Sequence, residues 1–362
     1  MLKKIVQNGF LLIISVLIAL IIGELFARIL FKDKINLFPK YHTDAHYGSF
    51  SLRSIIPNME FTHTSIVGTF FFKTNNRGFR NNNNIEYNKA PDEIRILCLG
   101  DSQTQGYEVN QDQTFSYIAE LLLNKQGMRW TVINAGVAGF GTAEELLFLE
   151  NEGYKYSPDV VVVGFSANDF EDNIKSGFFG LENDSLVIKK YEYLPGVNIQ
   201  NIIYKYKLFK FLGENSYLYT YTFFAAWKYF REQMTDNSKQ RLIEHYAIRT
   251  QEHYSEYEKN LTRNIISRMY SFCRQRNIHL IIIDIPECDM RSAIPTDMLC
   301  DFRDCSDALF YSQDMLLDYK KLNTTHVPHG QRHISSETHQ LFGKKIAEYV
   351  IKHNNLKSFS GK

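Results

Sequence analysis

The sequence predicts an α/β protein, a three-layer α/β/α sandwich with a parallel sheet, preceded by one N-terminal transmembrane helix. Short, almost wholly apolar runs indicate strands that are buried on both faces. These runs alternate with amphipathic segments of helical length, at a spacing that fits right-handed crossovers between parallel strands. A long uncharged run near the start predicts the transmembrane helix.

Composition excludes several classes of protein. The 362 residues include 41 Lys and Arg against 40 Asp and Glu, so the chain lacks the basic excess of a nucleic-acid-binding protein. A hydrophobic share of 44% supplies a packed core and excludes wholesale disorder. Five scattered cysteines without a CxxC pair do not form a disulfide scaffold.

The first segment, residues 1–31, is predicted to be a signal anchor. No charged side chain occurs from Ile5 to Gly23, a helix length of about 28 Å that is close to the thickness of the bilayer core. No small-residue cleavage site follows at residues 24–28, so we expect the helix to remain uncleaved. The rest of the chain is then expected outside the cytoplasm, although basic residues flank the helix on both sides.

The remaining chain divides into a lead-in segment and one large domain. Residues 32–90 are polar and aromatic and contain a predicted tight turn at 74–80. Residues 91–355 form the α/β domain, interrupted by a mainly helical insertion at about 174–258. Strands are predicted at 94–99, 130–134, 159–165 and 279–285, and helices at 114–124, 143–153 (with Thr142 as the cap), 254–276 and 337–353.

Three of these strands end in turns of unusual composition. Ser102 follows the first strand, Gly139 lies in a glycine-rich turn after the second, and Asn168 follows the third. Ligands of open parallel sheets gather at the carboxyl ends of the strands. A serine hydroxyl, a closely approachable backbone N–H and a side-chain amide together can attack a carbonyl and stabilise the oxyanion that results.

Other motifs fit these turns poorly. Residues 100–106 lack the Lys-[Ser/Thr] pair of a phosphate-binding loop, and glycines 136, 139 and 141 do not follow GxGxxG. No GxSxG nucleophile elbow is present.

The three blocks resemble those of the SGNH, or GDSL-type, hydrolase family. The matching residues are Gly-Asp-Ser102-x-Thr, Gly139 and Asn168-Asp169, and His333 stands before the last helix as the family's catalytic histidine does. The resemblance covers residues 91–355 and implies a flavodoxin-like sheet. It also implies Ser102 as nucleophile, His333 as base, and an oxyanion hole from the N–H groups of Ser102 and Gly139 with the Asn168 amide. Residues 75–80 resemble a segment found upstream of the first block in membrane-anchored bacterial members.

The sequence departs from the family before the histidine. The family places an Asp two or three residues earlier, where this chain has Gly330 and Gln331. That Asp orients the imidazole and stabilises the imidazolium, and its loss lowers rates by several orders of magnitude. The sequence therefore predicts a Ser–His dyad, with Gln331, a backbone carbonyl or a remote acid such as Asp318 holding the ring, or else a degenerate site.

Several of the same residues also have plain structural interpretations. Ser102 can serve as a helix cap and Asn168 as a turn residue. Asp101 and Asp169 are expected to hold their turns by hydrogen bonds without transferring protons. Cys98 is predicted to be a small buried hydrophobe.

The histidines and the remaining cysteines leave alternatives open. Four histidines near the C-terminus suggest a zinc site, but their spacing fits no closed site and surface or capping roles are the default. They are His326, His329, His333 and His339. Cys300 and Cys305 could pair outside the cytoplasm, although spacing alone does not establish a disulfide.

Together these observations predict a membrane-anchored hydrolase that cleaves an acyl ester, of the esterase or deacetylase type, on a carbohydrate or lipid. No cofactor, metal or nucleic-acid partner is expected, and the sequence does not indicate an oligomeric state. One alternative is an O-acyltransferase that passes the acyl group to a glycan hydroxyl through the same residues. Another is a non-catalytic binding or assembly protein with the same fold, which the missing acid alone supports.

Overall fold

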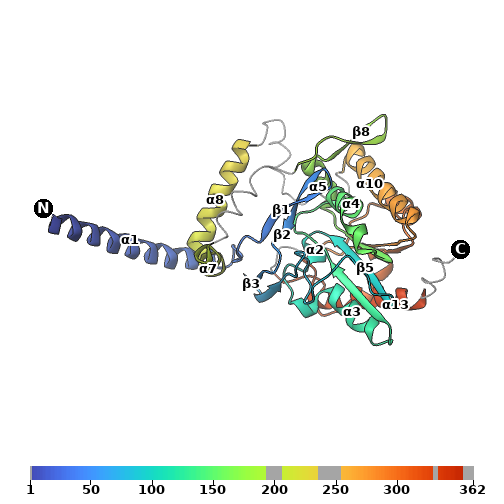
Figure 1. The fold of residues 1–362 in the computed structure, drawn as a ribbon, viewed down its shortest axis with the longest axis horizontal. Coiled ribbons are helices and arrows are strands. Elements are labelled where there is room, and N and C mark those ends of the chain that lie inside the picture. Colours follow the sequence, from blue (N-terminus) through green and yellow to red (C-terminus); the bar gives the residue numbers. More distant parts are fainter. Residues whose placement is uncertain (1, 193–205, 235–253, 329–332, 354–362) are drawn as a thin grey trace.

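A computed structural model describes residues 2–192, 206–234, 254–328 and 333–353. Figure 1 shows a compact α/β body from which the N-terminal helix extends on one side. Glutamine 331, expected to support the active site, lies outside the described residues.

The centre of the body is a five-stranded parallel sheet with the strand order β11-β10-β7-β5-β6. Counted along the chain this is the flavodoxin order 2-1-3-4-5. Every residue of β5 and β7 is buried, as their mainly apolar sequences predict. The strands are β5 (Glu93–Gly100), β6 (Arg129–Asn134), β7 (Val160–Phe165), β10 (His279–Asp284) and β11 (Ala308–Phe310).

Helices cover both faces of the sheet and confirm the three-layer architecture. On one face, Ile96 and Cys98 pack against α3 (Phe115–Asn124) and α13 (Ser336–Lys352). On the other, Leu97 and Leu99 belong to the core built with α4, α5 and α10. Cys98 is fully buried, as predicted. The helices of this second face are α4 (Thr142–Asn151), α5 (Asp169–Ser176) and α10 (Glu256–Gln275).

The segment between the N-terminal helix and the sheet forms two antiparallel hairpins that the sequence analysis did not predict. They are β1 (His42–Tyr47) with β2 (Phe50–Ile55), and β3 (Glu60–Ser65) with β4 (Gly68–Lys73). Their buried side chains, such as Leu52, Phe61 and Phe72, join the core that includes Leu97. The hairpins therefore pack onto the α/β body.

The insertion contains strands as well as helices. A short hairpin of β8 (Phe179–Glu182) and β9 (Ser185–Ile188) comes first, so the prediction of a mainly helical insertion misses this element. Helices α7 (Lys207–Asn215) and α8 (Tyr217–Met234) follow.

Short helices fill several connections between the larger elements. They are α2 (Ser102–Gln105), η1 (Gln111–Gln113), η2 (Gly153–Tyr156), η4 (Thr296–Met298), α11 (Leu299–Asp304), η5 (Ser312–Met315) and α12 (Leu316–Tyr319). One predicted cap is wrong, because Gly141 precedes α4 as its N-cap and Thr142 is its first residue. The Thr142 hydroxyl instead exchanges hydrogen bonds with the Asn173 amide.

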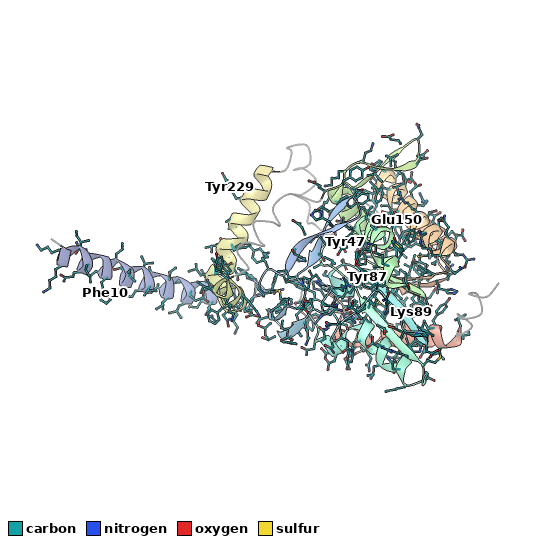
Figure 2. The ribbon with its side chains drawn as sticks, viewed as in Figure 1. Phe10, Tyr47, Tyr87, Lys89, Glu150 and Tyr229 are labelled. Atoms are coloured by element: carbon teal, nitrogen blue, oxygen red, sulfur yellow. The ribbon has the colours of Figure 1, made fainter. Side chains whose placement is uncertain are left out.

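The N-terminal helix α1 (Leu2–Phe31) is long and apolar enough to cross a membrane. Its mean hydropathy reaches 2.8, and only 6% of its most apolar window is buried in the protein. Its side chains, including the labelled Phe10, stand away from the body in Figure 2. A membrane anchor and a signal sequence share this length and composition.

Candidate active site

Ser102 is the first residue of α2 and is separated from the end of strand β5 by Asp101 alone. Asp101 caps the helix, because its Oδ1 accepts a hydrogen bond of 2.7 Å from the Gln103 N–H. Gly106 ends the helix in the left-handed conformation, with φ of 79°. The tight strand–helix connection places Ser102 at the carboxyl edge of the sheet, where the resemblance predicted it.

His333 lies beside Ser102, with its Nε2 at 2.9 Å from the Ser102 Oγ. The backbone holds the histidine from both sides: its carbonyl accepts from the Val327 N–H at 2.8 Å, and the next residue, Ile334, donates to Gln103 Oε1 at 2.9 Å. The Tyr107 ring lies 4.9 Å from the imidazole, centroid to centroid. The imidazole is therefore buried and fixed against the serine.

The second imidazole nitrogen has a carboxylate partner that the sequence analysis missed. Glu108 Oε2 lies 2.8 Å from His333 Nδ1, and its side chain is fully buried. A remote acid therefore holds the ring, as one of the alternatives expected, but Asp318 as that acid is wrong. Asp318 instead pairs with Lys345 at 2.8 Å and with Lys321 at 3.1 Å. An acid is thus present at His333, but it comes from the loop after the serine.

Arg80 holds the loop that carries Glu108. Its guanidinium donates to the carbonyl oxygens of Gln105 at 2.8 Å and Val109 at 2.7 Å, and also to that of Gly106. Burial lowers the pKa of Arg80 to about 9. A fully buried guanidinium whose donors meet three carbonyls of one loop fixes the backbone on both sides of Glu108.

A histidine from the second hairpin supports the same loop. His63 Nδ1 lies 2.7 Å from the Tyr107 carbonyl oxygen, and burial lowers the pKa of His63 to about 4. The ring is therefore neutral and donates its Nδ1 hydrogen to this carbonyl. Both supports come from residues 60–80, so the lead-in segment contributes directly to the geometry of the site.

Gly139 stands where a backbone donor can approach a ligand. Its φ is 80°, and a Cβ atom there would meet the Arg53 guanidinium at 2.9 Å. Arg53 donates to the Gly139 carbonyl at 2.6 Å and so fixes the orientation of this turn. Among the described residues, neither the Gly139 N–H nor the Ser102 N–H has a hydrogen-bond acceptor. Both groups are available to a ligand oxygen.

Asn168 lies on the exposed side of the same edge, immediately before α5. Its Nδ2 donates to Asp101 Oδ2 at 3.1 Å and to Asp172 Oδ2 at 2.8 Å. The amide therefore reaches the turn that carries Ser102. One of its two present acceptors must be exchanged when it donates to a ligand.

Buried carboxyl groups lie behind this edge. Asp169 accepts from the Ser166 N–H at 2.7 Å and holds its turn, while Glu145 lies buried in α4. Burial and the nearby acidic groups, Glu145 for Asp169 and Asp101 for Glu145, raise the pKa of both carboxyls well above their usual values. Burial also raises the pKa of Glu144 to about 8. In each case the shift favours the protonated form of the carboxyl.

The C-terminal histidines do not converge in the described part of the chain, where no three metal-ligating side chains form a group. His326 Nε2 lies 2.9 Å from the Pro286 carbonyl, and His339 Nδ1 accepts from the Phe115 N–H at 3.2 Å. His329 lies outside the described residues. Cys300 and Cys305 are both free thiols, so the disulfide alternative is wrong for this structure.

Ser102, His333 and Glu108 are arranged like the catalytic triad of a serine hydrolase. A hydroxyl contacts one imidazole nitrogen, and a buried carboxylate contacts the other. In such a triad the histidine accepts the serine proton, and the carboxylate stabilises the imidazolium that results.

Comparison with known proteins agrees with this chemistry. Residues 98–205 match the model of the GDSL-like lipase/acylhydrolase family. Over these residues, less than a third of its length, the chain is similar to this family, the SGNH hydrolases, and the match supports a carboxylic ester hydrolase. A comparison with curated proteins finds no significant sequence match.

Solved structures with a similar chain path include other esterases. The esterase EstA from Pseudoalteromonas sp. is 12% identical, with 72% of this chain and 98% of that chain covered and a TM-score of 0.40. The lipase/acylhydrolase from Enterococcus faecalis is 16% identical, with 71% and 95% covered and a TM-score of 0.39. At these TM-scores the likeness is too weak to support an inference about this chain.

Proposed function

We propose that this esterase is anchored in a membrane by α1 and removes an O-acyl group from a carbohydrate or lipid with a Ser102–His333–Glu108 triad. The proposal rests on two contacts of the His333 imidazole. Its Nε2 lies 2.9 Å from Ser102 Oγ, and its Nδ1 lies 2.8 Å from the Glu108 carboxylate. Glu108 takes the place of the acid that the family sets before its histidine. The missing acid was the only support for a non-catalytic protein, and Glu108 removes that support.

In the proposed mechanism, Ser102 Oγ attacks the ester carbonyl while His333 Nε2 accepts its proton. The carbonyl oxygen becomes an oxyanion that the N–H groups of Ser102 and Gly139 and the Asn168 amide stabilise. His333 then gives its proton to the leaving alcohol, and an acyl-Ser102 ester remains. Water attacks this ester with His333 as base, which releases the acid and restores the serine.

The proposed location follows from α1. The helix ends at Phe31, and its apolar surface is exposed unless lipid covers it. We therefore infer a single-pass membrane protein whose hydrolase domain lies outside the cytoplasm, where O-acylated glycans and lipids are accessible.

A substitution of the nucleophile tests the proposal. Ser102→Ala is expected to abolish hydrolysis of short- and long-chain nitrophenyl esters, while Ser185→Ala, an exposed serine on β9, keeps full activity. Esterase activity retained by a folded Ser102→Ala variant would contradict the mechanism.

Product analysis separates hydrolysis from acyl transfer, because both use the same residues up to the acyl-enzyme. With a polyol acceptor present, a hydrolase releases as much free acid as it releases leaving alcohol from the ester. Transfer of most acyl groups to the polyol would assign the chain to the O-acyltransferases instead.

A further inference from the structure

Specific contacts join the insertion helix α8 to the end of α1. The Glu24 carboxylate accepts hydrogen bonds from the N–H groups of Tyr217, at 3.2 Å, and Leu218, at 3.1 Å. It also accepts from the Ser216 hydroxyl at 2.7 Å. Glu24 thus satisfies the first backbone donors of α8 with a charge that suits a helix N-terminus. The start of α8 is thereby fixed at the point where the uncharged run of α1 ends.

Side-chain packing strengthens this joint over two further turns of α1. The rings of Phe31 and Tyr221 stack with centroids 4.5 Å apart, and the Arg28 guanidinium lies 5.5 Å above the Tyr217 ring. Arg28 also pairs with Glu24 at 2.8 Å. The two helices therefore hold a set angle to each other.

The angle between α1 and α8 is large. Figure 1 shows α8 rising from the end of α1 nearly across its direction, with α7 at the corner. Where α1 crosses a bilayer along the membrane normal, α8 runs along the membrane surface. The joint at residues 24–31 places it at the level where the span leaves the hydrocarbon core.

The outer side of the α7–α8 pair is aromatic and apolar. Tyr221 and Tyr229 on α8 are 46% and 60% exposed, and Leu208 and Phe211 on α7 are 61% and 60% exposed. Figure 2 shows the Tyr229 side chain on the side of α8 toward which α1 extends. Tyrosine and other amphipathic aromatic side chains are enriched at membrane–water interfaces.

The opposite side of the pair contacts the protein. Phe224 faces Lys40 Nζ, which lies 4.0 Å from its ring centroid, and Glu214 of α7 accepts from the Thr62 N–H of β3 at 2.9 Å. This side of the α7–α8 pair thus contacts the lead-in segment, whose hairpins support the active site. The remaining surface of the pair carries the exposed side chains of Leu208, Phe211, Tyr221 and Tyr229.

We propose that α7 and α8 lie in the interfacial region of the bilayer that α1 crosses, with their exposed aromatic side chains among the lipid headgroups. The proposal rests on the membrane anchoring proposed above. Continuity with the apolar surface of α1, where Leu25, Phe26 and Ile29 are also exposed, identifies the occupant as lipid. Contacts from α7 to the hairpins then fix the distance between the membrane and the Ser102 site.

Depth-dependent quenching of tryptophan fluorescence tests the placement in the full chain, reconstituted into phosphatidylcholine vesicles. Three variants share a Trp227→Phe background and retain the buried Trp130 as a constant reference. Tyr229→Trp reports on α8, Phe10→Trp on the span, and Tyr257→Trp, 49% exposed on α10, is the matched control in the hydrolase domain. The quenchers are phosphatidylcholines brominated near the headgroup or near the bilayer centre.

We expect Tyr229→Trp to lose emission mainly with the shallow quencher, Phe10→Trp to lose it with the deep quencher, and Tyr257→Trp to lose none. If Phe10→Trp is quenched and Tyr229→Trp behaves like Tyr257→Trp, the interfacial placement is wrong while the anchor stands. Protection of Tyr229→Trp that depends on protein concentration would assign the face to a second copy and overturn the proposal. If Phe10→Trp is not quenched either, both the anchor and this inference fail.

Discussion

In the proposed mechanism the Asn168 amide has to exchange one of its present acceptors for the oxyanion. This amide lies on the exposed edge of the site and donates to Asp101 and Asp172, at 3.1 and 2.8 Å. Burial raises the pKa of Asp101, because removal from water destabilises its charged form. The developing oxyanion carries a full charge and competes well for one amide hydrogen.

Removal of the amide is therefore expected to act on the chemical step. Asn168→Ala should lower kcat on the order of 10²–10³-fold with little change in KM, as loss of one oxyanion donor does. Steady-state ester hydrolysis measures both constants. Asn264→Ala, which removes an amide bonded only to the Asn260 carbonyl on α10, is the control. An unchanged kcat in Asn168→Ala would exclude Asn168 from the oxyanion hole.

At this scale the sequence predicts four site residues at one edge of the sheet, and hydrogen bonds of the structure join Ser102 to His333 and Asn168 to Asp101 there. Ser102, Gly139 and Asn168 follow strands whose carboxyl ends meet, and His333 enters just before α13. Glu108 was missed because its link to His333 spans 225 residues of the sequence and leaves no local pattern. A signal did exist, since an acid between the apolar, buried Tyr107 and Val109 requires a partner.

Among the elements, the segment after β4 has the clearest effect on the site. Arg80 lies at the end of the turn at residues 74–80 and donates hydrogen bonds to the carbonyls of Gln105, Gly106 and Val109. It touches no reacting atom and acts by positioning Glu108. A lysine offers three donors around one nitrogen and does not reproduce a planar fork that spans these carbonyls.

Arg80→Lys is expected to lower kcat on the order of 10²-fold, because small displacements of a catalytic group are costly. In a Glu108→Gln background the same change should have almost no further effect, since the carboxylate it positions is already absent. Arg77→Lys, in the same turn but paired with the exposed Glu86, is the control. Equal losses from Arg80→Lys in both backgrounds would show a general structural role instead.

The helices and strands could be predicted best where both faces of a strand are buried. Four of the five sheet strands are built around short apolar runs, and the sequence predicts each to within one or two residues. β11 has only three residues, too few to show a period. The hairpins β1–β2 and β3–β4 alternate buried and half-exposed positions with many polar side chains, so their short strands resemble loops.

For the whole molecule, the buried carboxyls beneath the site make one contribution to stability that depends on pH. Both oxygens of Glu145 lack hydrogen-bond partners among the described residues, and burial raises its pKa well above the usual value. Burial also raises the pKa of Glu144 to about 8. The folded state therefore holds these protons more tightly than the unfolded chain does.

The contribution of these carboxyls to the free energy of unfolding is expected to fall as the pH rises from about 5 to about 8, because the unfolded chain releases these protons first. Glu145→Gln removes one such group, so its unfolding free energy should depend less on pH and exceed that of the parent protein at pH 8. Denaturant unfolding of the full chain in mild detergent measures this, with the exposed Glu256→Gln as control. A steeper fall in Glu145→Gln would contradict the assignment.

The most direct test of the account concerns Glu108, the residue that makes the site a triad. The rate at which a fluorophosphonate labels Ser102 reports the nucleophile activated by His333, independently of substrate choice. Glu108→Gln is expected to slow labelling on the order of 10³–10⁴-fold while leaving the fold intact, as loss of the orienting acid does in other triads. Asp318→Asn should label at the parental rate. Rapid labelling of a folded Glu108→Gln variant, or slow labelling of Asp318→Asn, would contradict the Ser102–His333–Glu108 assignment.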